Sequence, residues 1–352
     1  MDVCFALVAG GGSVVDHVIT ASIERHQGNS DGYLILEMEE EVEGELYYYY
    51  SGKKETFDVP EEGDYELIAV GGRGGWCNNN SGGYGAQASG TFHLSKGDQL
   101  NIFVGGKGGD CNSEFVEFHY DKRATVYTGA GGAGATFIEW DDGTSKTPKL
   151  LLVGGGGGGA GKDYGGDDGE DGQDGGFPWG GKNGEGGKLS CQDNGIICNF
   201  FLNGGAGGGG YNGDGASRCG DLTECYDDYN PVQKNRNEEC KQGKENLLAE
   251  GGKSFQNGGV GGKKRVDYSG TDDSGVCTSR YINGGFGGFG GGGEGGIFFA
   301  GQYDEGLEDI DLKGVGDDPT EHEEKFEHGG GGGGGGYGGG GAGEFQGLGG
   351  GG

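Results

Sequence analysis

The amino-acid sequence predicts a mainly β protein, in which an antiparallel β-sandwich continues into a bundle of polyglycine II helices that carries a cysteine-rich insert. Two observations lead to this prediction. Three short apolar strands, Leu67–Val70, Ile102–Val104 and Leu150–Val153, each run directly into glycine. The 352 residues include 95 glycines but only 5 prolines, and a hydrophobic content of 31% limits the conventional core to one modest domain.

The third of these strands runs into six consecutive glycines: Gly154, Gly155, Gly156, Gly157, Gly158 and Gly159. Glycine loses more conformational freedom on folding than any other residue, so an ordered run needs compensating interactions. Extended glycine helices of about three residues per turn supply them, because bare backbones can approach closely enough to bond N–H to C=O between segments. The alternative is a flexible linker. Interruptions by Phe, Tyr and Trp and the scarcity of serine favour order.

Composition divides the chain into successive regions. The expected regions are an N-terminal segment of uncertain structure (1–45), a β-sandwich (46–153), a glycine-rich helical region (154–300) with a cysteine-containing insert (189–280), an acidic linker (301–328) and a glycine-rich tail (329–352). The N-terminal segment lacks the positively charged residues with which a signal peptide begins, so its sequence is a poor match to a signal peptide. We expect the tail to be frayed around Gly351.

The sandwich is predicted from short alternating strands separated by turn signals. The expected strands are Thr56–Val59, Tyr65–Val70, Ala88–Leu94, Gln99–Val104, Ala135–Trp140 and Leu150–Val153. The last two flank Asp141-Asp142-Gly143, in which Asp-Gly is a strong hairpin signal. Only this part of the chain has enough apolar residues for a packed core, and Asn235–Glu250 is the only helix that the sequence suggests.

Four stretches of the sequence carry a resemblance to a known family. They are FDVPEEGDYELIAVGGRGG (57–75), SGTFHLSKGDQLNIFVGGKGGD (89–110), GAGGAGATFIEWDDG (129–143) and LLLVGGGGGGAG (150–161). In order and spacing they resemble the extracellular glycine-rich region of the anaplastic lymphoma kinase and leukocyte tyrosine kinase receptors. The similarity extends roughly from Tyr47 to Gly296 and is specific from Phe57 to Gly161.

This resemblance implies a tumour-necrosis-factor-like, or jelly-roll, β-sandwich joined to a polyglycine helix bundle on a cell-surface receptor that binds small basic cytokines. The family also has cysteines in the region of the insert. It returns to further strands after its last glycine run, whereas this sequence ends in glycine, so the sheet that the resemblance implies is incomplete here.

Catalysis is not expected from these residues. The sequence has no H-R-D, D-F-G or V-A-I-K motif of a protein kinase. Matches to GxGxxG arise by chance among 95 glycines, and none lies between a strand and a helix with an acidic residue downstream. We therefore predict a non-enzyme without a cofactor.

The formal net charge of −32 argues against nucleic acid as a partner, because no basic stripe is present to neutralise phosphates. It favours a protein partner, for which a basic protein is one candidate, bound through an acidic surface. No apolar run reaches the roughly 18 residues of a membrane-spanning helix.

Residues 166–175, GDDGEDGQDG, place glycine at every third position. Their carboxylates could hold calcium, but the D-x-[DN]-x-[DN]-G loop is missing. The preferred interpretation is a glycine helix whose glycines face inward and whose acidic side chains face solvent.

The cysteines gather in and beside the insert. Cys191, Cys198, Cys219, Cys225, Cys240 and Cys277 are the candidate disulfide cysteines, whereas Cys4, Cys77 and Cys111 lie outside. Without a C-x-x-C motif zinc is a weak interpretation, and a disulfide-bonded insert in an oxidising, extracellular compartment is preferred. The single glycosylation sequon, Asn79-Asn80-Ser81, predicts Asn79 as a candidate acceptor on a loop.

Three functions fit the sequence. The first is a non-catalytic extracellular module, like the ligand-binding ectodomain of a receptor tyrosine kinase. The second is a secreted structural, matrix or adhesin-like protein in which the glycine bundle is itself the function. The third, an antifreeze protein of polyglycine helices, is disfavoured by the charge and the sandwich.

Overall fold

A computed structural model describes most of the chain. The described residues are 18–25, 31–38, 46–111, 114–117, 123–161, 164–170, 172–176, 179–189, 205–219, 247–263, 266–271, 277–282, 285–301, 330–342, 347 and 349–352. This part of the chain is mainly β, and its only labelled helix is the one-turn 3-10 helix η2 (Phe255–Asn257). The mainly β prediction is confirmed.

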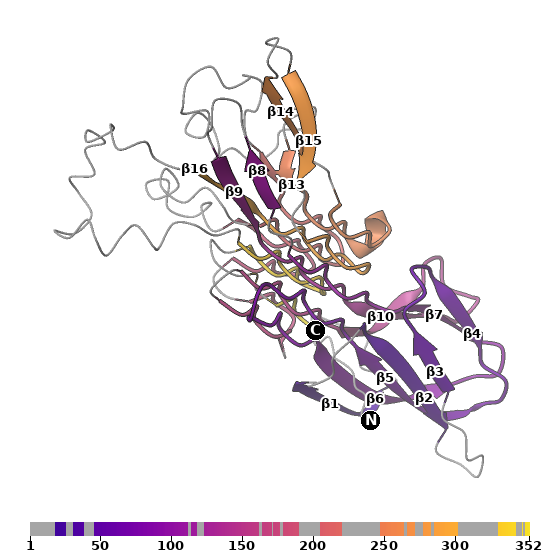
Figure 1. Cartoon of the computed structure of the whole chain (residues 1–352). Coiled ribbons are helices and arrows are strands. Elements are labelled where there is room, and N and C mark those ends of the chain that lie inside the picture. The colour runs from indigo at the N-terminus through magenta and orange to yellow at the C-terminus, as the bar shows by residue number, and fades with distance from the viewer. Residues whose placement is uncertain are drawn as a thin grey trace.

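Two antiparallel sheets occupy one end of the molecule (Figure 1). The five-stranded sheet has the order β1 (Val18–Arg25), β6 (Ala86–Leu94), β5 (Gly63–Val70), β2 (Tyr33–Met38) and β3 (Leu46–Tyr49). The four-stranded sheet has the order β11 (Lys149–Gly154), β10 (Thr136–Asp141), β7 (Gln99–Phe103) and β4 (Glu55–Asp58). The five-stranded sheet thus includes two strands from the N-terminal part of the chain.

The two sheets pack face to face over one apolar core. Leu34, Leu67 and Phe92 of the five-stranded sheet belong to the same buried cluster as residues of the other sheet. The partners from the four-stranded sheet include Leu100, Ile102, Ile138, Trp140 and Leu152. Burial of such side chains stabilises a fold by about 1.5–3 kcal/mol each, so this core is the main apolar contribution to stability.

The predicted hairpin is confirmed, because β10 and β11 pair antiparallel with Phe137 opposite Val153. Its turn is held by Asp142, whose carboxylate accepts hydrogen bonds from the backbone N–H groups of Thr144 and Ser145. Gly143 takes a left-handed φ of 67°, a conformation that glycine adopts without a steric penalty.

Smaller sheets lie at the end of the molecule opposite to the large ones (Figure 1). They pair β12 (Arg218–Cys219) with β13 (Leu247–Ala249), β14 (Val266–Thr271) with β15 (Cys277–Ile282), and β9 (Arg123–Thr128) with both β8 (Glu114–Glu117) and β16 (Ile297–Gly301). The prediction of a helix at 235–250 is wrong for its last residues, because residues 247–249 form the strand β13. Residues 235–246 lie outside the described part of the chain.

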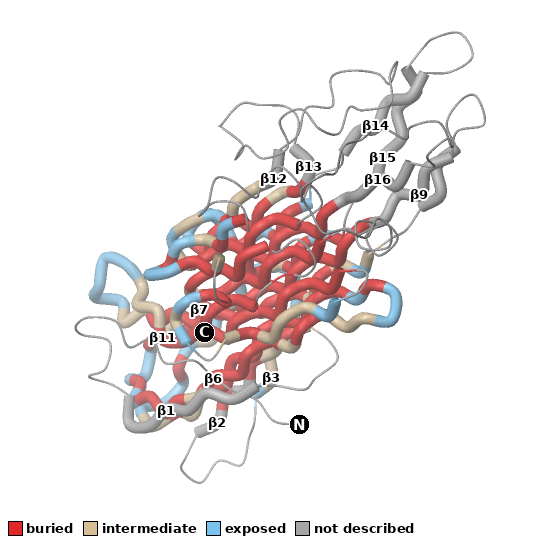
Figure 2. The backbone as a smooth tube through the Cα atoms, turned by 90° about the vertical axis from the view of Figure 1, so that its left-hand side faces the viewer, coloured by how far each residue is buried: buried red, intermediate tan, exposed pale blue. Residues whose placement is uncertain are grey.

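Between the two groups of sheets run the glycine-rich segments, which we call the glycine bundle (Figures 1 and 2). Its segments are 71–75, 82–85, 105–109, 129–135, 154–161, 164–169, 172–176, 179–188, 205–216, 249–263, 285–296, 330–342 and 349–352. The interior of the bundle is buried although it contains hardly any side chains (Figure 2).

The bundle segments bond to one another through their backbones, and the partner changes with a period of three residues. In segment 129–135 the N–H groups of Ala130, Gly131, Gly132, Ala133, Gly134 and Ala135 donate in turn to the carbonyls of Ala160, Gly109, Gly293, Gly157, Gly106 and Gly290. Each third residue therefore returns to the same neighbouring segment. Backbone hydrogen bonds thus satisfy groups whose burial would otherwise be costly.

The C-terminal glycines belong to this network, and the expectation of a frayed tail is wrong. Gly351 is buried, its N–H donates to the carbonyl of Gly338, and its own carbonyl accepts from Tyr337. A Cβ at Gly351 would lie 2.5 Å from the carbonyl oxygen of Gln173. The tail is ordered here because its bare backbone fits between other segments.

Candidate functional site

The predicted structural glycines, Gly154–Gly159, leave β11 and enter the middle of the bundle, where all six are buried. Their N–H groups reach several different segments. Those of Gly156, Gly157, Gly158 and Gly159 donate to the carbonyls of Gly335, Gly72, Asp167 and Gly332. This run is therefore hydrogen-bonded to three other segments: 71–75 after β5, the segment 164–169 that contains Asp167, and the C-terminal segment 330–342.

Side chains are excluded from this part of the bundle by close backbone approach. A Cβ added to Gly156 would lie 2.5 Å from the carbonyl oxygen of Ala133, a separation that real Cβ atoms do not reach. Gly172 is different, because a Cβ there would meet nothing within 4 Å. Of the glycines repeated every third residue in 166–175, the other three face neighbouring backbone.

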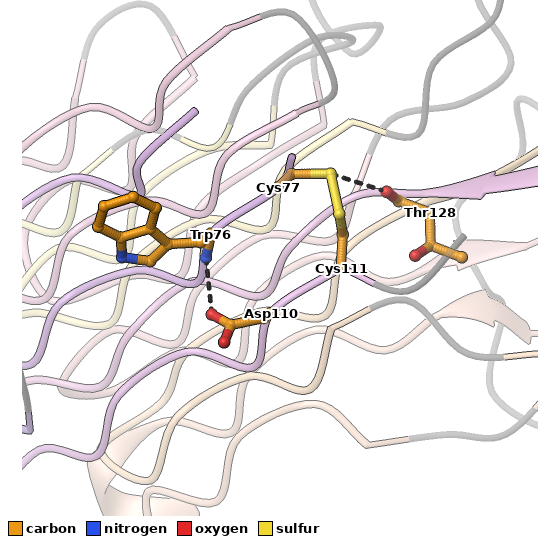
Figure 3. The surroundings of a disulfide bond; sticks show 5 residues. All are labelled: Trp76, Cys77, Asp110, Cys111 and Thr128. Carbon is orange, nitrogen blue, oxygen red and sulfur yellow. Dashed lines mark hydrogen bonds between the residues drawn. A yellow bond between two sulfur atoms is a disulfide. The ribbon is translucent and has the colours of Figure 1, made fainter. Parts of the chain in front are cut away.

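A disulfide joins Cys77 and Cys111, with a Cα–Cα distance of 5.0 Å (Figure 3). The two cysteines end segments that run side by side, since the N–H of Gly108 donates to the carbonyl of Arg73 and that of Cys111 to Trp76. Cys77 is buried, and its Sγ lies 3.3 Å from the carbonyl oxygen of Thr128. The disulfide therefore ties two bundle segments together beside a third.

Sequence reasoning did not select this pair, although a signal was present. Cys77 ends the stretch GGRGGWC and Cys111 ends the stretch GGKGGDC, so each cysteine has the same place after a strand and five glycine-rich positions. Repeated spacing of this kind brings equivalent positions of neighbouring segments together.

Charged groups reinforce the surroundings of the disulfide. Asp110 accepts a hydrogen bond from the backbone N–H of Trp76 at 2.8 Å (Figure 3). The same carboxylate pairs with Lys107 at 2.8 Å. Partial burial raises the pKa of Asp110, but the bonds from Lys107 and Trp76 outweigh it and leave that pKa below its usual value. The Arg73 guanidinium is buried and lies 4.8 Å from the ring centre of Trp76 and 4.2 Å from that of Tyr84.

Asn79, the candidate glycosylation site, is exposed in the tight turn that follows Cys77. Cys77 and Asn80 exchange two backbone hydrogen bonds of 2.9 Å across this turn. Asn78 takes a left-handed φ of 53°, which asparagine tolerates better than most residues. The sequon is therefore on the surface of the molecule, next to the disulfide.

A second group of aromatic side chains joins the four-stranded sheet to the glycine bundle. Phe137 on β10 and Phe103 on β7 contact Phe255 of η2, with ring centres 4.6 and 4.5 Å apart. Tyr211 stacks on Phe255 at 5.3 Å and donates its hydroxyl to Glu139 at 3.0 Å. Because these bundle residues cover its outer face, β10 is buried on both sides, which the alternating strand pattern did not predict.

The Glu139–Tyr211 pair has perturbed acidity. Burial raises the pKa of Glu139, and the bond from Tyr211 and the charge of Lys54 only partly oppose this effect. Burial and the neighbouring Glu139 carboxylate likewise raise the pKa of Tyr211 well above its usual value. This pair has the geometry of a structural contact between the sheet and the bundle.

The most exposed aromatic surface of the sandwich is on its edge strands. β3 is the last strand of the five-stranded sheet, and β4 is the last strand of the four-stranded sheet. We call Leu46, Tyr47, Tyr48, Tyr49, Glu55 and Asp58 the β3–β4 flank. Tyr49 is 64% exposed and Leu46 41%, and Tyr47 stacks on Tyr49 at 6.2 Å. Burial raises the pKa of Tyr48, as do the charges of Glu55 and Asp58.

The remaining sequence-predicted residues fall largely outside the described part. Cys191, Cys198, Cys225 and Cys240 lie outside it. Cys219 and Cys277 belong to β12 and β15, and nothing is described of their side chains. The disulfide-bonded insert therefore stays a prediction.

Among the described residues no His, Cys, Asp and Glu side chains gather in a group able to hold a metal ion. Within the same residues no helix has the length and apolar character needed to cross a membrane. No protein-family model and no curated protein matches the sequence.

Proposed function

We propose that this chain is a non-catalytic extracellular recognition module, resembling the ligand-binding ectodomain of a receptor tyrosine kinase, that binds a basic protein partner through the sandwich. The observation that carries this proposal is the β3–β4 flank, in which the exposed ring of Tyr49 and the carboxylates of Glu55 and Asp58 belong to two edge strands, and the charges of these carboxylates act on Tyr48. The formal net charge of −32 makes the whole surface attractive to a basic partner and repulsive to nucleic acid.

The chemistry of the flank fits this class of partner. Tyrosine rings attract lysine and arginine through cation–π contacts, and carboxylates beside the rings add ion pairs. Tyrosine is also common at interfaces, because it combines a large apolar area with a polar end. Within the described residues β3 is the last strand of its sheet, and addition of a strand at a sheet edge is a recurring mode of peptide recognition.

The glycine bundle would act as the rigid support of this surface. We propose that its segments are polyglycine II helices, since three residues per turn explains a hydrogen-bond partner that recurs every third residue. The sandwich is proposed to have the jelly-roll topology that the family resemblance implies. The Cys77–Cys111 disulfide supports an oxidising compartment, and hence an extracellular or cell-surface location.

The proposal is tested with the full chain immobilised and a panel of small basic secreted proteins measured by biolayer interferometry. We expect at least one member to bind with an affinity that falls as salt is raised. The triple variant Tyr49→Ser/Glu55→Gln/Asp58→Asn should lower that affinity at least about tenfold, because it removes a ring and two charges from the interface.

The matched control is Tyr164→Ser/Asp174→Asn/Glu185→Gln, which removes an exposed ring and two charges from the glycine bundle. This variant should bind as the wild type does. An equal loss of affinity in both variants would show that binding depends on the overall charge of the chain and not on the β3–β4 flank, which would contradict the proposed surface. Absence of binding by every member of the panel would contradict the proposal as a whole.

A second function is favoured by a different observation. The bundle is buried, ordered to its last residues and bonded throughout by its backbone, as expected of a secreted structural, matrix or adhesin-like protein. In that case the flank variant would change no binding, whereas the assembly of the chain into larger particles, followed by light scattering, would depend on the bundle.

A further inference from the structure

We propose that Asn79 carries an N-linked glycan whose first sugar packs against the exposed face of Trp76. This inference rests on the proposed extracellular location, because the modification is made in the secretory pathway.

The acceptor residue is placed where a glycan can be attached. Asn79 is exposed at the tip of a turn closed by the mutual hydrogen bonds of Cys77 and Asn80, so a bulky group on its side chain would extend into solvent. The sequon hydroxyl belongs to Ser81, which is only half-buried. No other N-x-[ST] sequence occurs in the chain, so this is the only acceptor that the sequence offers.

An aromatic ring lies three residues before the acceptor in the sequence. Trp76 is 40% exposed, although an indole of this size would ordinarily be largely buried. The Arg73 guanidinium lies over its ring at 4.8 Å, and the Trp76 backbone N–H is fixed by Asp110 at 2.8 Å. The ring is thus held in place while part of it stays open to solvent.

The chemistry of a sugar suits such a surface. One face of an N-acetylglucosamine ring is lined by C–H groups, which are attracted to the electron-rich face of an indole. The hairpin register places Trp76 opposite Ser81 and within one turn of Asn79. The Arg73 cation over the ring, the disulfide at Cys77 and the glycan would together hold this turn against the bundle.

The test uses the full chain directed into the secretory pathway of cultured cells by an added leader. Peptide-N-glycosidase F should release one glycan and convert Asn79 to aspartate, as read by peptide mass spectrometry. Asn79→Gln and Ser81→Ala should abolish this change. An unmodified Asn79 in chain that carries the Cys77–Cys111 disulfide would overturn the proposal while leaving the proposed extracellular location intact.

The role of Trp76 has its own measurement. Enzymatic removal of the glycan should lower Tm by about 1–2 °C in the wild type and in Trp76→Phe, which keeps an aromatic face. The same treatment should leave the Tm of Trp76→Ala unchanged. An equal decrease in Trp76→Ala would show that the sugar does not pack on this ring. The affinity of Asn79→Gln for the basic partner is measured separately, and it should equal that of the wild type because the proposed partner surface is the β3–β4 flank.

Discussion

In the sandwich, Leu67 and Phe92 are buried against side chains of the facing sheet, whereas in the glycine bundle Gly156 is buried against the backbones of three other segments. The first region gains stability from apolar surface removed from water. The second has almost no side chains to bury and depends on satisfied backbone hydrogen bonds and close packing. The two regions should therefore respond to mutation in opposite ways: the sandwich to lost atoms and the bundle to added ones.

The largest expected effect is that of a side chain added inside the bundle. Gly156→Val should destabilise the chain by at least about 3 kcal/mol, because its Cβ displaces the Ala133 backbone and several hydrogen bonds are lost. The control is Gly172→Val, in open space within the same kind of sequence, which should change stability by no more than about 0.5 kcal/mol. Thermal unfolding of both variants measures the difference. Equal Tm values would indicate that the glycine run around Gly156 behaves as a flexible linker and not as a packed bundle.

Removal of the Cys77–Cys111 disulfide should have the next largest effect. Cys77→Ala/Cys111→Ala opens a loop with a sequence separation of 34, for which about 2–4 kcal/mol of stability is expected to be lost. Because the wild type and this variant share the remaining cysteines, the difference between their denaturant midpoints isolates this bond. Identical midpoints under oxidising conditions would show that it adds nothing to the bundle.

A smaller effect is expected where the two regions meet. Tyr211→Phe removes the donor that serves the Glu139 carboxylate and should cost about 1–2 kcal/mol. Tyr49→Phe is the matched control, because it removes a hydroxyl from a ring that is 64% exposed, and it should be nearly neutral. Equal effects in urea unfolding would mean that the Glu139–Tyr211 bond does not couple sheet to bundle.

The smallest expected effect is a pH dependence at the same contact. The folded-state pKa of Glu139 is raised above its usual 4.5, so the folded chain holds this proton more tightly than the unfolded chain does. Its contribution to stability is therefore present at low pH and is lost as pH rises through the folded-state pKa. The Tm of Glu139→Gln minus that of the wild type should increase from about pH 4.5 to about pH 7.5. A flat or falling difference would contradict the shift.

Much of the sandwich could be predicted from the sequence, and much of the bundle could not. Apolar alternation and turn residues predict the strands around Leu67, Ile102 and Leu152, because the pattern of their side chains indicates which face is buried. Order in the glycine runs was also predictable. Which segments are neighbours was not, because glycine carries no side chain that could specify that Gly156 meets Gly335.

The functional residues show the same division. The Cys77–Cys111 pair could have been found from the repeated GGxGGxC spacing, and the exposure of Asn79 follows from its turn-forming neighbours. The β3–β4 flank could not be found in this way. Its formation depends on β3 and β4 both being edge strands of separate sheets, a tertiary arrangement to which no local pattern points.

Amide hydrogen exchange followed by mass spectrometry measures whether the glycine bundle is an ordered structure held by backbone hydrogen bonds. Peptides that cover 154–161 should remain largely unexchanged after about an hour at neutral pH, because their N–H groups are buried and bonded. Peptides that cover the exposed loop 51–54 should exchange at once and give the reference. Full exchange of 154–161 at the rate of that loop would contradict the claim.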